Sequence, residues 1–227
     1  MTRRRPALVA ALTLAATLLV AACGGGAPSA SPGATATPTA MPPGTYTSTG
    51  FTPKVTYTVG NGWLVARDID GYLAIQPAGA DTGGVFIFKG AKAASQDASC
   101  PASPEPNIGS TSVEMVAWIR SLKGLQVSSP AMATVFGLPA TSLDISLQPG
   151  WTQSCAFASG LPTVPLIMSS VIDHWVVVDN ERLRLFLVDV PNQGTILVDI
   201  DAFDGTVFDS LVADAMPIVK SLTLAGQ

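Results

Sequence analysis

Alternating apolar and polar residues at the start of the folded region predict β-strands. Val55–Val59 alternates apolar and hydroxylated side chains, which is the period of a half-buried strand. The dipeptide Asn61-Gly62 follows at once and precedes a second apolar run, so the pattern predicts a tight hairpin there. Two further strands are expected at residues 72–75 and 85–88, on either side of a glycine-rich turn at 79–84. Four short strands should therefore open the domain.

The hydrophobic period then changes to that of an α-helix. Thr111 and Glu114 have the spacing of a capping box, in which each side chain satisfies a free backbone amide of the first turn. Gly124 stands where a left-handed residue commonly ends a helix. The intervening apolar side chains fall at i, i+3, i+4 and i+7 and are Met115, Trp118, Ile119 and Leu122. The pattern predicts one amphipathic helix between Thr111 and Gly124.

Strands return after this helix. A hairpin is expected from 133–136 and 140–147 around a turn at 137–139, and the remaining strands are expected at 165–168, 175–178, 183–190 and 195–200. The last two flank residues 191–194, and a change of one residue in that turn would exchange the buried and exposed faces. If Asn192-Gln193 is the loop, Arg184 faces Asp201 across the pair.

A second helix is expected at the end of the chain. Asp204 or Thr206 can cap its start, and Pro217 predicts a kink or break near Met216. Its apolar stripe is Phe208, Leu211, Val212, Ala215, Val219 and Leu222. Hairpins interrupted by helices are typical of an α+β domain. We therefore expect a single domain over residues 44–227, an antiparallel sheet of hairpins with both helices packed on one face.

The first 23 residues carry a different pattern. Three arginines at 3–5 precede an apolar run at 7–20, an arrangement typical of export signals, and the run is shorter than the roughly 20 residues of a membrane span. It ends in LVAAC at 19–23, which resembles the lipobox of bacterial lipoprotein signal peptides. In that family the peptide is cut before the cysteine, and the thiol carries lipid, palmitate included. The resemblance implies a signal peptide at 1–22 and a lipid-anchored, extracytoplasmic protein attached to the cell membrane through Cys23. An ordinary signal peptide cut after Ala22, or a retained membrane anchor, are the alternatives.

Residues 23–43 should form a lipidated cysteine followed by a flexible linker. The part at 24–43 has no charged side chain and almost no large one, so it cannot bury enough apolar surface to offset its ordering entropy. The whole chain has a net charge of −4. Removal of 1–22 leaves nine Lys and Arg against 16 Asp and Glu, a net charge of −7. Such a domain has no electrostatic footprint for nucleic acid, and membrane attachment must come from lipid rather than from charge.

Scattered short motifs resemble a group of uncharacterised bacterial lipoproteins. They are GTY at 44–46, Phe51, VTYTV at 55–59, GW at 62–63, LDISLQPGW at 143–151, PLI at 165–167 and IVKSL at 218–222. The layout of elements is also similar to the PsbP-like α+β fold, in which an antiparallel sheet packs against helices. The first resemblance brings no established activity, and the second implies a fold that hosts several roles.

Cys100 and Cys155 are expected to form a disulfide in an oxidising compartment, with two free buried thiols as the alternative. No Cys-x-x-Cys motif occurs, so redox catalysis and a zinc site are not expected. His174 is the only histidine. Its neighbour Asp173 would point to the opposite face of a strand, and no Gly-x-Ser-x-Gly elbow is present, so His174 is expected to be a surface or edge-strand residue.

Asp199, Asp201 and Asp204 loosely resemble a calcium loop. The third acid comes one place late, and Ser210 stands where the closing glutamate belongs. We therefore expect solvated carboxylates at a strand end and a helix cap, with no metal.

Core packing explains most of the aromatic residues. Trp151 and Phe157, in the loop around Cys155, are the candidates for an exposed ligand patch. The sequence predicts a binding or accessory module with no cofactor and no catalytic activity, whose partners are the membrane and an unknown protein or hydrophobic small molecule. A carrier of a small hydrophobic ligand or lipid, held between sheet and helices, is the first alternative. An enzyme with an unrecognised site is the second.

Overall fold

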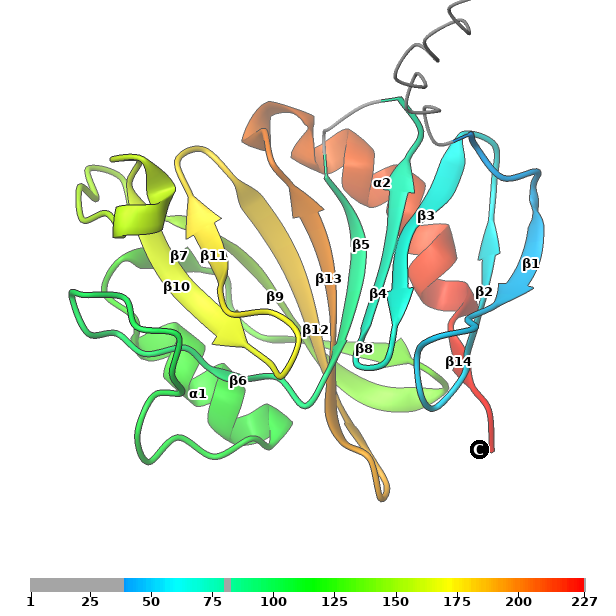
Figure 1. Ribbon diagram of the computed structural model, residues 1–227, viewed down its shortest axis with the longest axis horizontal. Coiled ribbons are helices and arrows are strands. Elements are labelled where there is room, and N and C mark those ends of the chain that lie inside the picture. Colours follow the sequence, from blue (N-terminus) through cyan, green and yellow to red (C-terminus); the bar gives the residue numbers. More distant parts are fainter. Residues whose placement is uncertain (1–38, 80–82, 227) are drawn as a thin grey trace, which may run out of the picture. The chain divides into compact units, whose positions relative to one another are not determined.

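An antiparallel eight-stranded sheet forms the centre of the fold (Figure 1). Along the sheet its strands are β3 (Trp63–Ile69), β4 (Tyr72–Pro77), β5 (Gly83–Lys89), β13 (Gly194–Ala202), β12 (Arg182–Val190), β9 (Leu138–Leu147) and β7 (Leu125–Val127), with β8 (Ala131–Val135) also paired to β9. This computed structural model describes residues 39–79 and 83–226. The predicted signal peptide, Cys23 and residues 24–38 of the linker lie outside the described residues.

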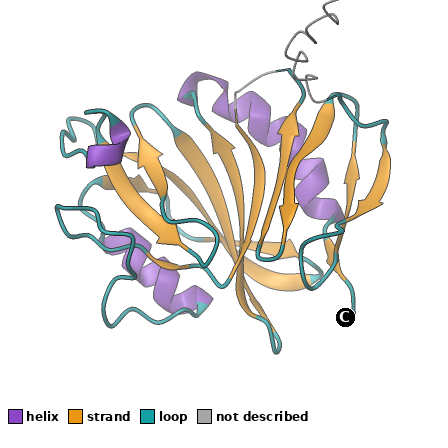
Figure 2. Ribbon diagram, viewed as in Figure 1, coloured by secondary structure: helices purple, strands orange, loops and turns teal. Residues whose placement is uncertain are grey.

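Each face of the central sheet is covered by one helix and one small sheet. The first face carries α2 (Phe208–Ser221) and the strands β1 (Gly44–Thr47), β2 (Val55–Val59) and β14 (Thr223–Leu224). The second face carries α1 (Ser112–Ser121) and the strands β6 (Lys92–Ala93), β10 (Thr163–Met168) and β11 (Trp175–Val178). Two short 3-10 helices are η1 (Ala156–Ala158) and η2 (Gly205–Val207). Figure 2 shows strands in the middle and helices outside them.

The predicted α+β class and antiparallel sheet are confirmed, but the prediction that both helices pack on one face is wrong. In β12, Leu183, Leu185 and Leu187 pack in the core that contains α1. The alternate residues Phe186 and Val188 pack in the core that contains α2. Because the middle of β12 is buried on both faces, its residues 185–188 are all apolar, as expected for a strand inside three layers.

The hairpin predicted at Asn61-Gly62 is also wrong. β2 pairs with β1 and β14 in one sheet, whereas β3 pairs with β4 in the central sheet. Gly62 has a φ of +82°, so the dipeptide does form a turn, but that turn leads the chain from one layer to another. The predicted hairpin of β8 and β9 is present, and its turn lies at Phe136 and Gly137, both with positive φ.

The first helix begins as predicted. Thr111 is its N-cap and makes the reciprocal capping box with Glu114. Gly124 is not a left-handed end residue. A Cβ atom there would lie 2.5 Å from Val164 Cγ2 and 2.7 Å from Trp151 Cε2, so glycine allows close packing instead.

The second helix runs through Pro217 without the predicted break. The carbonyl that loses its partner belongs to Ala213, which is exposed together with Pro217, so water can satisfy it. Asp204 caps η2, its side chain accepting from the amide of Thr206. Among the described residues neither helix has the length and apolarity to cross a bilayer.

The folded unit extends past the predicted boundary at Gly44 into the C-terminal end of the linker. The amide of Met41 donates a hydrogen bond of 2.7 Å to the carbonyl of Trp63, and the Met41 side chain packs against the core. The Tyr46 hydroxyl donates to the carbonyl of Pro42 at 2.7 Å. Residues 41–42 thus belong to the domain surface.

Candidate functional site

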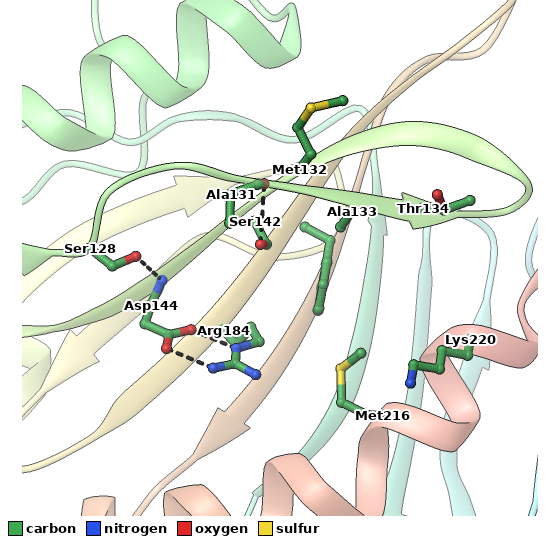
Figure 3. Close-up of a pocket in the computed structure, with 11 residues that line it drawn as sticks. Ser128, Ala131, Met132, Ala133, Thr134, Ser142, Asp144, Arg184, Met216 and Lys220 are labelled. Carbon is green, nitrogen blue, oxygen red and sulfur yellow. Dashed lines mark hydrogen bonds and ion pairs between the residues drawn. The ribbon is translucent and has the colours of Figure 1, made fainter.

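A groove of about 530 Å³ lies between the β8–β9 hairpin, β12 and α2 (Figure 3). Its apolar wall includes Ala133 from β8, Phe186 from β12 and Met216 from α2. Its polar wall includes Asp144 and Arg184. Lys220, in the last turn of α2, supplies a second cation. A hollow of this size lies within the range that holds small molecules.

Strand β8 forms one edge of the groove, which residues 131–134 line. Ala133 is half-buried and packs against the core shared with α2, whereas Met132 is 95% exposed. Figure 3 shows the Met132 and Thr134 side chains pointing away from α2, as the period of two residues requires. Of these four residues, Ala133 is therefore the one whose side chain packs against that core.

Arg184 and Asp144 form an ion pair in the polar wall of the groove. Arg184 Nε and Nη2 donate to the two oxygens of Asp144 at 2.6 and 2.7 Å. The bidentate contact with Asp144 raises the pKa of Arg184, and the Ser128 hydroxyl accepts from the amide of Asp144. The side chains are 30% and 35% exposed, so solvent screens the pair and its contribution to stability is small.

The alternative that paired Arg184 with Asp201 is wrong. Val190 pairs with Gly194, so the loop has three residues and Arg184 lies opposite Ile200. Asp201 lies opposite Leu183 instead. The register thus places Arg184 on the α2 face and Asp201 on the α1 face of the sheet.

The predicted disulfide is present, with S–S 2.04 Å and Cα–Cα 5.7 Å between Cys100 and Cys155. Trp151 lies near it, half-buried, and its indole N–H donates to the carbonyl of Thr163 at 3.1 Å. A hollow of about 250 Å³ is lined by Trp151 and both cysteines. The predicted ligand patch is thus split, because Phe157 is not part of this lining.

Phe157 is 47% exposed and packs on His174, with 4.4 Å between ring centroids. His174 Nε2 also lies 3.1 Å from the carbonyl oxygen of Cys100. The histidine therefore links the two loops that the disulfide joins. These contacts indicate a structural role for His174.

Three buried carboxyl groups lie on the α1 side of the sheet and were not predicted. Asp199 and Asp201 are 0% and 1% exposed and Glu181 is 5% exposed, so the expectation of solvated carboxylates is wrong. The indole N–H of Trp175 donates to Asp199 Oδ2 at 2.8 Å, and the amide of Val178 donates to Glu181 Oε2 at 2.8 Å. Oδ1 of Asp199 and Oδ1 of Asp201 have no hydrogen-bond partner among the described residues.

Burial changes the protonation of these groups. Desolvation raises the pKa of Glu181 to about 7, and it raises the pKa values of Asp199 and Asp201 well above the usual range. At Asp201 the neighbouring carboxyl groups of Asp199 and Glu181 raise the pKa further. No group of three or more His, Cys, Asp or Glu suited to a metal ion occurs in the described part of the chain.

A sequence signal for this cluster did exist. Leu197, Asp199 and Asp201 share one face of β13 at a period of two, inside a run that is otherwise buried. The groove, in contrast, had no local signal, because its walls come from segments far apart in the chain.

No protein-family model matches the chain. No curated protein matches it either. Among solved structures it is similar to the solution structure of cyanobacterial PsbP (CyanoP) from Synechocystis sp. PCC 6803. The match covers 79% of this chain and 92% of that one, with 9% identity and a TM-score of 0.39. The PsbP-like fold is also the one that the sequence layout resembles.

Proposed function

We propose that this protein is a lipid-anchored, extracytoplasmic binding module that holds a small anionic amphiphile in the groove between β8 and α2 and performs no chemistry on it. The groove of about 530 Å³, with apolar and cationic walls, is the observation that carries the proposal. A concave site with a few convergent polar groups is the usual form of a small-molecule site.

The two kinds of wall indicate the class of ligand. Ala133, Phe186 and Met216 offer apolar surface, and a flexible methionine adapts to hydrocarbon of different shapes. Lys220 and Arg184 add two positive charges against the single carboxylate of Asp144. An acyl chain with a carboxylate, phosphate or sulfonate at one end complements this surface.

Binding without chemistry agrees with the residues of the groove. Asp144 has both carboxylate oxygens engaged by Arg184, and the groove lining contains no histidine or cysteine. The described residues therefore offer no nucleophile with an adjacent base at this site.

Two substitutions by phenylalanine test the site. Ala133→Phe places a ring in the groove, whereas Val113→Phe places the same ring on α1, where Val113 is exposed on the other face of the sheet. We expect the full-length wild-type protein and Val113→Phe to bind the anionic fluorophore anilinonaphthalene sulfonate alike, with decanoate as a competitor. Ala133→Phe should weaken binding at least about tenfold, a change of about 1.4 kcal/mol. Equal binding by all three proteins would contradict the proposal.

A second experiment tests the role of Lys220 in binding the charged group of the ligand. Lys220→Ala should weaken decanoate binding while leaving decanol binding unchanged, because only the former carries a charge. Lys123→Ala is the matched control, since Lys123 is exposed beyond the end of α1 on the other face. An equal loss for both ligands would show that Lys220 does not contact the charged group.

The anchor has its own test. The lipobox supports acylation of Cys23, and two or more acyl chains hold a protein stably to a bilayer. Mass spectrometry of the N-terminal peptide should find Cys23 acylated and residues 1–22 removed. Cys23→Ala should move the protein from the membrane fraction to the soluble fraction. An unmodified Cys23 in mature protein would contradict the anchor.

A further inference from the structure

Another hollow lies on the α1 face of the sheet, away from the groove. It has a volume of about 160 Å³ and is lined by His174, Trp175, Val176, Glu181, Asp201 and Phe203. Aromatic side chains thus form part of its wall, and two of the three buried carboxyl groups contribute to it. The third, Asp199, lies two residues before Asp201 on the same face of β13.

The three carboxyl groups lack a positive partner. Among residues 39–79 and 83–226 no ion pair reaches Glu181, Asp199 or Asp201. The nearest arginines in sequence, Arg182 and Arg184, lie over the ring of Phe208 on the opposite face, 4.2 and 5.8 Å from its centroid. An acid cluster with two unpartnered oxygens is costly to bury, so it must either keep protons or take a cation from outside.

The surroundings indicate which cation. A calcium ion takes six to eight oxygen ligands, and no suitable group is present in the described chain. A primary ammonium group carries three N–H donors, which suits oxygens that lack donors, and it is attracted to the faces of aromatic rings. A quaternary ammonium group has no donor for those oxygens.

We propose that this hollow, the acid pocket, binds the primary ammonium group of a small amine between Trp175, Phe203 and the carboxyl groups of Glu181 and Asp201. The proposal is independent of the groove and of its ligand. On binding, the ammonium group replaces a proton held by the carboxyl cluster, so charge is conserved inside the pocket.

The proton exchange makes the affinity depend on pH. The pKa of about 7 at Glu181 predicts that amine binding strengthens from pH 6 to pH 8, by up to about tenfold per pH unit for each proton released. Tyr72 faces the cluster from β4, and burial raises its pKa to about 12, so it stays neutral in this range. The titratable or charged groups around the cluster are Glu181, Asp199, Asp201, His174, Tyr72 and, beside Tyr72, Arg67.

The indole N–H resonance of Trp175 reports on the pocket, because that group is hydrogen-bonded to Asp199. We would titrate the full-length protein at pH 6, 7 and 8 with ethylammonium chloride against sodium chloride of equal ionic strength. The expected result is a saturable shift with ethylammonium that strengthens with pH, and none with sodium or calcium chloride. No saturable shift with ethylammonium, or saturation with calcium alone, would overturn the proposal.

Asp201→Asn tests the carboxyl group with its size kept. It should abolish the saturable shift, whereas Asp214→Asn, at an exposed position of α2, should leave it unchanged. A dispersed Trp175 resonance in the variant verifies that it folds. Retained binding by Asp201→Asn would overturn the proposal. An acetylated lysine methylamide serves as a protein-like amine, and binding of that probe without ethylammonium would overturn the assignment to a small free amine.

Discussion

The indole N–H of Trp175 donates a 2.8 Å hydrogen bond to Oδ2 of Asp199 and joins β11 to the central sheet through a fully buried carboxyl group. The Trp175 ring lies 4.8 Å from the rings of both Phe86 and Phe88. One polar contact is thus set inside an aromatic cluster. A carboxyl group in such surroundings favours its neutral form, so the stability of the fold should depend on pH.

The first prediction is that the protein is more stable at pH 5 than at pH 8. A carboxyl group with a raised folded-state pKa stabilises the fold while it is protonated in both states, and this stability is lost as pH rises through the folded pKa. Burial raises the pKa of Glu181 from 4.5 to about 7. The free energy of unfolding should therefore fall by roughly 3 kcal/mol as the pH rises from 4.5 to about 7. Asp199 and Asp201 act in the same direction. Urea denaturation at both pH values measures the difference, and greater stability at pH 8 would contradict the raised pKa values.

Asp201→Asn should remove much of this pH dependence. The amide stays neutral at every pH and supplies donors to the neighbouring carboxyl groups, so the variant should gain stability at pH 8. Asp214→Asn is the control, because Asp214 is exposed on α2. An unchanged slope of unfolding free energy against pH in Asp201→Asn would place the titration elsewhere.

Removal of the disulfide should destabilise the protein by about 2–4 kcal/mol, because the bond closes a long loop in the unfolded chain. The two cysteines are 55 residues apart. The double variant Cys100→Ser, Cys155→Ser would be compared with wild type by urea denaturation. It should also loosen His174, which contacts Cys100 and Phe157 on the two joined loops. Equal midpoints and an unchanged His174 NMR spectrum would contradict this role.

Gly124→Ala should cost about 1–3 kcal/mol, as expected for overpacking a buried contact. The added methyl group would approach Val164 and Trp151 to 2.5 and 2.7 Å. Gly60→Ala is the matched control, because a Cβ atom there meets nothing within 4 Å. Thermal unfolding of the two variants separates the effect of close packing from the general effect of replacing glycine.

Local patterns predicted those parts of the fold that local forces determine. The capping box of Thr111 and Glu114 starts a helix, since its hydrogen bonds lie within one turn. The apolar runs at 72–75 and 85–88 form paired strands, in which Ile75 lies opposite Val85. Pairing of Cys100 and Cys155 followed from the expected compartment.

Long-range contacts determine what the sequence pattern could not predict. Asn61-Gly62 specifies a turn, but β2 pairs with β1 and with β14, where Val55 lies opposite Leu224. Helical periodicity shows which face of α1 and α2 is apolar, and it does not show which face of the sheet each helix covers. The aspartates of β13 resemble an exposed strand end until β11 and Trp175 cover them.

The most direct test of the binding function is native mass spectrometry of the full-length protein purified from its source. The account predicts a bound anionic amphiphile in the wild-type protein and in Val113→Phe, and its loss in Ala133→Phe. Wild-type protein that carries no such ligand, or Ala133→Phe that retains it, would contradict the assignment of the groove.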